Sequence, residues 1–400
     1  MRIAFALGLC LAAGVLTTST MTEGRLSALP REGAVSIATA SPPARVALGR
    51  LLFWDPVLSG NNDVACATCH HPDFAYSDGR DLSLGTNAVG LGPARRGAGA
   101  RPTVPVRRNS PTLVNVAFNG VTLDNVGNGA DAPMFWDLRV RSLERQALEP
   151  IKAHDEMRGD AYSERDAVPA VVARLAANAE YRRLFAAAFG DRDAVNATNL
   201  GRALAVFERT LVASNSPFDR YMRGETGAMT DEQVRGMERF ESAGCANCHS
   251  GSMFSDFAPH VLGIPDHPAL AESDAGAGAY EFRTPSLRNV GLTAPYMHDG
   301  VFRSLDEVLN FYRRVSFGRG RGGRGRFGSA QRGVNPNVSR DTLDPLLRQL
   351  NMRGGGRREI IAFLQALDDP DFDRVVPARV PSGLEVGGRI SLRSAGPIGP

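Results

Sequence analysis

The chain has 400 residues, of which 43% are hydrophobic and 22% are charged. This length exceeds the usual size of one domain, so we expect two domains that each bury a core. The formal net charge of +3 becomes −2 without five arginines that lie in the Gly/Arg-rich stretch 316–333. The bulk of the chain is therefore close to neutral, which gives a role in nucleic-acid binding little support.

The N-terminus has the pattern of an export signal. An apolar run at 3–16 follows Arg2, and a run of this length is too short to span a membrane comfortably. We predict a signal peptide over residues 1–22, with an uncleaved N-terminal anchor as the alternative. Leu9 precedes Cys10, which argues against a lipoprotein cleavage site because that position requires a small residue. We expect no other membrane span.

The first helix is expected over residues 43–53, where apolar residues recur at helical spacing. Cys66, Cys69 and His70 follow in the spacing Cys-x-x-Cys-His. Two intervening residues let both thiols reach the vinyl groups of one haem, and the histidine becomes the proximal ligand of its iron.

The same motif recurs at Cys245, Cys248 and His249. A four-cysteine zinc site or a thioredoxin-like redox pair would also use these cysteines, but neither explains a histidine directly after both pairs. We therefore predict two covalently bound c-type haems, one in each half of the chain, and no disulfide framework. Covalent haem attachment of this type occurs outside the bacterial cytoplasm, so we expect the protein in the periplasm.

A long loop and then helices are expected between the two motifs. Residues 77–110 are rich in Gly, Pro and Arg without a sustained period, which is typical of a loop wrapped on the haem. Apolar positions at helical spacing predict helices around 168–175, 181–189 and 200–211. The turn-rich sequence at 214–217 ends them, so we place the N-terminal haem domain at 31–213.

The second half follows the same plan. Thr230 and Gln233 form the pattern of a capping box for a helix that leads into the second motif. Later helices are expected around 305–312 and 360–367. The predicted C-terminal domain, a cytochrome c-like haem domain, covers 214–380, and an unstructured tail covers 381–400. Residues 316–333 resemble RNA-binding low-complexity sequence, but a solvated loop suits an exported protein better.

No strand pattern longer than a few residues is present. The predicted fold class is therefore mainly α, with two c-type cytochrome-like haem domains and long loops.

Several motifs occur in an order typical of one family. They are 51–55 (LLFWD), the first haem motif, 108–112 (RNSPT), 135–137 (FWD), Gln146, Glu156, the second haem motif and 293–300 (TAPYMHDG). With them the chain resembles the bacterial di-haem cytochrome c peroxidases and MauG over roughly residues 48–369. The resemblance implies that haem 1 is the peroxidatic centre, haem 2 an electron relay or store, and Trp136 the charge carrier between them. It also places Glu156 and Gln146 over haem 1.

These roles agree with the chemistry of the residues. Cleavage of hydrogen peroxide on ferric iron needs a group that takes a proton from the bound oxygen and returns it to the leaving oxygen, which a carboxylate in a largely apolar pocket can do. An amide can orient the peroxide. Read without the resemblance, Glu156 and Gln146 would be surface polar residues and Trp136 a core aromatic. The family's spacing of 136, 146 and 156 favours the functional interpretation.

One departure from the family concerns haem 1. Some members hold haem 1 inactive with a second histidine from the loop after the first motif, but residues 77–128 contain no histidine. His71 adjoins the proximal ligand, and His154 is the remaining candidate, for which a surface role is favoured. We expect a five-coordinate haem 1 that is open to peroxide without reductive activation.

A second departure concerns the far ligand of haem 2. Peroxidases of the family that draw electrons from small cytochromes have methionine fourteen residues after the histidine of the Pro-Tyr-x-His-Asp-Gly motif, and MauG-like members have tyrosine. Counting from His298 gives Tyr312. A phenolate lowers the reduction potential of the haem and favours high-valent iron, whereas a thioether raises the potential. Met297 and Met352 are the alternative ligands, and Tyr312 as a plain core residue stays open.

The resemblance further implies a calcium ion between the haem domains. Its ligands would be the Asn109 side chain and the carbonyls of Thr293 and Pro295, and oxygen donors of this kind suit calcium. Without the resemblance these three would be ordinary turn residues.

Three functions follow as hypotheses. The first is a MauG-like enzyme that uses hydrogen peroxide to oxidise a periplasmic protein through high-valent haem. The second is a cytochrome c peroxidase that takes electrons from a small cytochrome or cupredoxin. The third is a di-haem electron carrier. Glu156, Gln146 and an open haem 1 argue against the carrier, and Tyr312 separates the first two.

Overall fold

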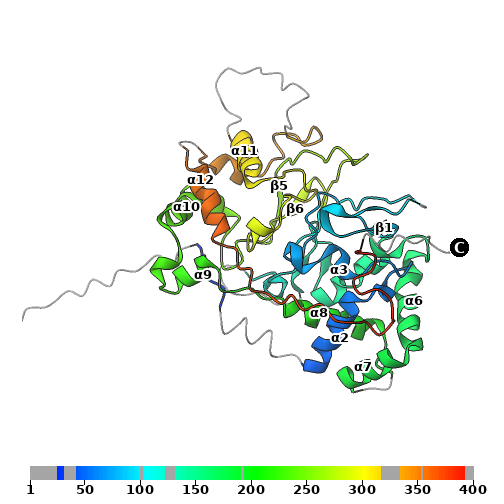
Figure 1. Cartoon of the computed structure of the whole chain (residues 1–400). Helices are drawn as coiled ribbons and strands as arrows, with labels where there is room; N and C mark the ends of the chain where they lie inside the picture. Colours follow the sequence, from blue (N-terminus) through cyan, green and yellow to red (C-terminus); the bar gives the residue numbers. More distant parts are fainter. Residues whose placement is uncertain are drawn as a thin grey trace, which may run out of the picture.

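A computed structural model describes residues 25–30, 42–99, 102–121, 131–190, 193–316, 334–352 and 355–391. The predicted signal peptide, residues 317–333 of the Gly/Arg-rich stretch and residues 392–400 lie outside the described residues. The described part is mainly helical, as predicted, and its helices form two groups (Figure 1). None of the described helices is both long enough and apolar enough to cross a membrane.

The first group of helices surrounds the first haem motif. Its members are α2 Pro43–Trp54, α3 Cys66–Cys69, α4 Leu143–Gln146, α5 Glu149–Lys152, α6 Glu164–Ala177, α7 Ala179–Phe189 and α8 Ala197–Arg209. The predicted helices α2, α6, α7 and α8 are confirmed. Helix α2 packs closely on α8, where a Cβ added to Gly49 would lie 2.0 Å from the carbonyl oxygen of Ala203. Only glycine therefore permits this close crossing.

The second group repeats this arrangement. Its members are α9 Pro217–Met222, α10 Asp231–Ser242, α11 Leu305–Ser316 and α12 Arg357–Gln365. The predicted capping box at Thr230 and Gln233 is confirmed, because each side chain accepts a hydrogen bond from the other residue's backbone N–H. Helix α10 packs closely on α12, and a Cβ added to Gly236 would lie 2.0 Å from the Glu359 carbonyl oxygen. Each half is thus built on a crossing of two helices through a glycine.

Short elements make up most of the rest. Three antiparallel pairs of strands are β1 Ala88–Val89 with β2 Arg96–Gly97, β3 Pro133–Met134 with β4 Val140–Arg141, and β5 Pro259–Val261 with β6 Glu281–Arg283. The 3₁₀ segments are η1 Pro56–Leu58, η2 Pro72–Phe74, η3 Gly92–Ala94, η4 Val116–Phe118, η7 Thr226–Ala228, η8 Cys245–Asn247, η9 Val290–Leu292 and η10 Pro345–Gln349, and η6 His154–Arg158 is a π-helix. Between 77 and 110 the described residues hold only β1, β2 and η3, in agreement with the predicted loop.

The C-terminal segment packs on the first half of the chain, although the domain prediction assigned residues up to 380 to the second domain and residues 381–400 to a tail. Phe372 and Val380 belong to the core of the first half. Further along, Ser382 Oγ donates to Asp55 at 2.6 Å and Gly387 N donates to the Trp54 carbonyl at 2.8 Å. Figure 1 shows this segment returning from α12 to the first half. The sequence did not indicate these contacts, because a Gly/Ser/Pro-rich segment does not reveal buried acceptors more than 300 residues away.

Candidate di-haem site

The first haem motif forms one helical turn, α3, followed by His70. The Nδ1 of His70 lies 2.9 Å from the carbonyl oxygen of Tyr76. A carbonyl can only accept, so Nδ1 carries the proton and Nε2 is left to bind a metal. Burial lowers the pKa of His70, which keeps the imidazole neutral as an iron ligand must be.

The second motif has the same arrangement. Cys245 begins η8, and the Nδ1 of His249 lies 2.9 Å from the carbonyl oxygen of Phe254. Burial again lowers the histidine pKa. All four motif cysteines are free thiols, and burial raises the pKa of Cys69 and of Cys245 to about 12. Both motifs thus present two unpaired thiols and one oriented neutral histidine, which fits covalent c-type haem.

The residues predicted to lie over haem 1 are Gln146 and Glu156. Gln146 is the last residue of α4, and Glu156 lies on the π-helix η6, a rare geometry that often occurs at functional sites. Within the described residues neither side chain has a hydrogen-bond partner. Burial, and then the charge of Asp155, raise the pKa of Glu156 to about 7. The charge of Glu156 in turn raises the pKa of both thiols of the first motif, so this carboxyl lies close to that motif.

The two histidines considered as extra ligands of haem 1 have other contacts. His71 is 7% exposed and packs edge-on against Trp54 with ring centroids 5.4 Å apart. His154 is exposed, and its Nε2 lies 2.8 Å from Asp160. These contacts suit a structural and a surface role, respectively.

Trp136 lies where the two halves of the chain meet. Its indole Nε1 donates to the carbonyl of Asn109 at 3.1 Å, and its own carbonyl accepts from the backbone N of Arg283 at 2.7 Å. The neighbouring Asp137 pairs with Arg108 at 2.6 Å, and Arg108 also pairs with Asp274 at 2.7 Å. These contacts tie the segment after the first motif to β6 and to the loop before it.

A largely apolar cavity surrounds the second motif. Trp136, His249 and Tyr312 all line it, and so do the alternative ligands Met297 and Met352. Tyr312 lies on α11, and burial raises the pKa of its phenol. The structure thus brings every candidate ligand of haem 2 to one cavity, and Tyr312 as the ligand remains a prediction.

The predicted calcium ligands lie near the same cavity. Asn109 and Thr293 line it, and Pro295 is buried after a cis peptide bond from Ala294. The Asn109 backbone N donates to the carbonyl of His298 at 2.7 Å, so the two predicted ligand segments are in direct contact. Calcium binding itself remains a prediction.

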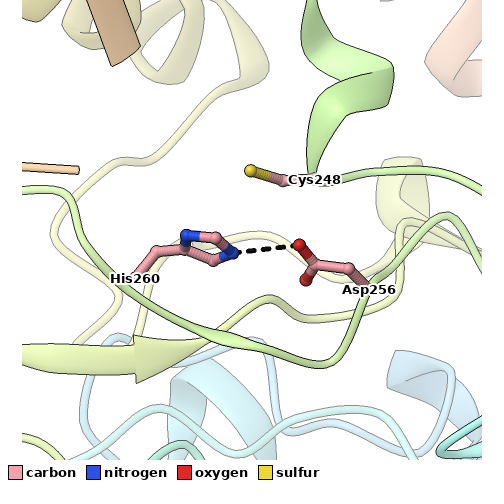
Figure 2. Close-up of side chains that lie close together, drawn as sticks. All are labelled: Cys248, Asp256 and His260. Carbon is pink, nitrogen blue, oxygen red and sulfur yellow. Dashed lines mark hydrogen bonds and ion pairs between the residues drawn. The ribbon is translucent and has the colours of Figure 1, made fainter. Parts of the chain in front are cut away.

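A cluster of Cys248, Asp256 and His260 resembles a metal site in its side-chain types (Figure 2). His260 lies on β5, with Nε2 3.0 Å from Asp256 and Nδ1 2.6 Å from Asp344. The hydrogen bond to Asp256, followed by the one to Cys248, raises the pKa of His260 to about 11. The contacts with Asp256 and Asp344 still favour the protonated imidazole without the thiol. Because haem attachment consumes the sulfur of Cys248, we interpret the cluster as a charged edge of the haem 2 site.

Comparisons with known proteins decide the family. Residues 43–227 match the family model described as di-haem cytochrome c peroxidase. The chain is 35% identical over 336 residues to the methylamine utilization protein MauG of Methylorubrum extorquens, covering 81% of this chain and 78% of the relative. The chain belongs to the di-haem cytochrome c peroxidase and MauG family. Members of this family carry two c-type haems and use hydrogen peroxide, so this protein is a peroxide-dependent di-haem oxidoreductase.

Other relatives of this di-haem peroxidase come from both branches of the family. The cytochrome c551 peroxidase of Pseudomonas aeruginosa is 32% identical over 285 residues, which are 68% of this chain and 72% of the relative. A solved MauG-like protein associated with microbial copper homeostasis is 27% identical with a TM-score of 0.64, covering 86% of this chain and 93% of its own.

The sequence did not point to two buried charged residues of this di-haem peroxidase. Glu208 on α8 is 4% exposed, its Oε2 has no hydrogen-bond partner among the described residues, and burial raises its pKa to about 8. Its charge has the largest effect of any charge on the Cys66 thiol. Arg283 on β6 is 8% exposed and lines the haem 2 cavity. The run of apolar residues 203–207 before Glu208 was the available signal, because it indicates a helix that is buried all round.

Proposed function

We propose that this protein is a MauG-like enzyme that oxidises a periplasmic protein with hydrogen peroxide, at a distance from haem 1. The observation that carries the proposal is Tyr312, which lies in the same cavity as His249 at the family's ligand spacing from His298. An anionic phenolate would stabilise oxidised haem 2 and make it a poor acceptor of electrons from a small cytochrome.

The haems supply the irons at which peroxide is reduced and oxidising equivalents are held, and the protein controls protons and geometry. Glu156 takes a proton from the bound peroxide oxygen and returns it to the leaving oxygen. A pKa of about 7 suits both steps at neutral pH. The Gln146 amide orients the peroxide by hydrogen bonding. Trp136, held by Asn109 and Arg283, is the route for charge between the two halves.

The second candidate function is an ordinary cytochrome c peroxidase that takes electrons from a small cytochrome or cupredoxin. Met297 and Met352 favour it, because both line the haem 2 cavity and could provide a thioether ligand. In either case we place the protein in the periplasm, with calcium bound by Asn109, Thr293 and Pro295.

The resting diferric protein tests the proposal directly. We expect paramagnetic resonance to show one high-spin and one low-spin haem, because residues 77–128 supply no second histidine for haem 1. Peroxide added without any reductant should then give a state oxidised by two equivalents that involves both haems. Two low-spin haems, or a need for prior one-electron reduction followed by rapid turnover with a small cytochrome, would establish the ordinary peroxidase instead.

A further inference from the structure

The wall of the haem 2 cavity contains a buried cation that has no counter-ion in the described part of the chain. The guanidinium of Arg283 makes one hydrogen bond, from Nε to the carbonyl of Phe135 at 2.9 Å, and lies 5.7 Å from the ring centre of Phe257. Within the described residues it forms no ion pair. Burial lowers its pKa to about 10, and no neighbouring charge opposes this effect.

A second buried arginine in the same half of the chain does have a counter-ion. Arg288 is 2% exposed, but its Nη1 pairs with Asp219 at 2.7 Å. In the described wall of the haem 2 cavity, Asp344 is the one carboxylate, and it is bound to His260.

A buried charge needs a partner because it loses its hydration. In the described structure Arg95 is also buried without an ion pair, but its Nη atoms donate to backbone carbonyls. The Nη atoms of Arg283 have no acceptor among the described residues, so an anion on the group that fills the cavity would complete this site.

The group that fills the cavity carries such anions, because a c-type haem has two propionate carboxylates. A guanidinium is suited to carboxylates, since it can donate two parallel N–H bonds. We propose that Arg283 binds a propionate of haem 2 through its Nη atoms and, through its other contacts, fixes the position of Trp136 relative to that haem. The second part rests on the proposed role of Trp136.

The link to Trp136 comes from two hydrogen bonds of the same residue. The backbone N of Arg283 donates to Trp136, and its Nε donates to Phe135. Phe135 has a φ of 64°, in the left-handed region that non-glycine residues rarely adopt. Such a backbone persists only where its surroundings hold it. The Nε contact is one of the holding bonds, so a shift of the Arg283 side chain is transmitted to the backbone that carries Trp136.

The test uses the full-length holoenzyme and three variants. Arg283→Gln removes the cation, Arg283→Lys keeps it without the planar fork, and Arg303→Gln removes a largely exposed cation from the same half as a control. Haem content and attachment are checked by absorption and mass. The main measurement is the reduction potential of the low-spin haem 2 by spectroelectrochemistry, which does not depend on turnover.

We expect Arg283→Gln to shift the ferric/ferrous equilibrium of haem 2 at least tenfold toward ferric, a fall of about 59 mV for a one-electron couple. The physical reason is that an unpaired propionate stabilises the ferric charge. In Arg283→Lys most of this shift should be absent. In Arg303→Gln the ferric/ferrous equilibrium of haem 2 should differ from that of the wild type by less than threefold. A potential in Arg283→Gln equal to that of the Arg303 control would overturn propionate binding. Should Arg283→Gln not fold, an Arg283→Lys protein with the wild-type potential and stability would support a charge contact. An Arg283→Lys protein whose ferric/ferrous equilibrium is shifted tenfold or more toward ferric would contradict it.

The positioning of Trp136 is tested separately. After peroxide addition, the state shared by both haems should form at least tenfold more slowly in Arg283→Gln than in the Arg303 control. An unchanged rate together with a lowered potential would remove the positioning role and leave propionate binding. A wild-type protein that forms no shared state would contradict the proposed function, while the potential would still decide propionate binding.

Discussion

The two haem sites share one motif but differ in the buried titratable groups around it. Around the first motif the described residues include the buried carboxyl groups of Asp78, Glu156 and Glu208, whose pKa values burial raises to about 6, about 7 and about 8. Around the second the protein buries the guanidinium of Arg283 and the phenol of Tyr312. Carboxyl groups that titrate near neutral pH suit proton transfer to and from peroxide. The cation, together with the phenolate ligand that we propose for Tyr312, would instead suit control of the reduction potential. On the proposed function, the same motif would support proton chemistry at one haem and electron storage at the other.

The largest effect should come from removing the phenol at haem 2. Tyr312→His should keep haem 2 low-spin but abolish the two-equivalent state shared by the haems, because a neutral imidazole no longer stabilises its oxidised form. Rapid mixing with peroxide, followed by absorption and paramagnetic resonance, measures this state. Trp136→Phe is the companion variant and should slow formation of the state without abolishing it. Persistence of the shared state in Tyr312→His would show that this phenol is not the ligand that matters.

The next effect should come from the proton acceptor at haem 1. Glu156→Gln should slow the reaction with peroxide by about 100-fold to 10,000-fold, the range of general acid–base effects, while both haems remain attached. Stopped-flow absorption gives the rate. Asp155→Asn is a matched control because it removes the adjacent charge and leaves Glu156 in place. In the wild type the rate should fall below a pH of about 7, where the Glu156 carboxyl becomes protonated. Unchanged kinetics in Glu156→Gln would assign the proton transfer to another group.

The smallest effect should be on stability. Burial raises the pKa of Glu208 from 4.5 to about 8, so between these pH values the folded protein binds a proton that the unfolded chain has lost. The free energy of unfolding should therefore fall as pH rises through this window. Glu208→Gln should remove part of this fall and be more stable than the wild type at pH 8 by up to a few kcal/mol, at about 1.4 kcal/mol for each pKa unit. Urea unfolding of the holoenzyme at pH 5 and pH 8 measures the difference.

Glu144 provides a control of opposite sign for this experiment. Burial alone would raise its pKa, but the hydrogen bond and charge of Arg209, a backbone hydrogen bond and the charge of Arg202 together outweigh burial and lower the pKa below its ordinary value. Its contribution to stability is therefore present above the ordinary pKa and lost as pH falls. Glu144→Gln should be less stable than the wild type at neutral pH.

The outcome that contradicts the Glu208 prediction is an equal pH dependence of the free energy of unfolding in the wild type and in Glu208→Gln. This result would mean that Glu208 is not a buried acid in the folded protein.

The sequence alone determined the features that depend on neighbouring residues. Two residues between cysteines and an adjoining histidine define each haem site, because attachment chemistry is local. The period of apolar residues located α2, α6, α7 and α8, and the capping box at Thr230 marked the start of α10. The order of several motifs along the chain was enough to identify the family.

Only the tertiary structure decided the features that depend on distances between remote segments. Residues 381–391 return to the first half, where the buried Asp55 carboxylate accepts a hydrogen bond from Ser382 and the buried Trp54 carbonyl accepts one from Gly387. A sequence likewise does not show whether a buried charged residue forms an ion pair. Arg288 forms one with Asp219, whereas Arg283 forms none with a carboxylate among the described residues. A linear pattern records which groups a chain carries, but the energy of a buried charge depends on what folding brings within a few ångströms of it.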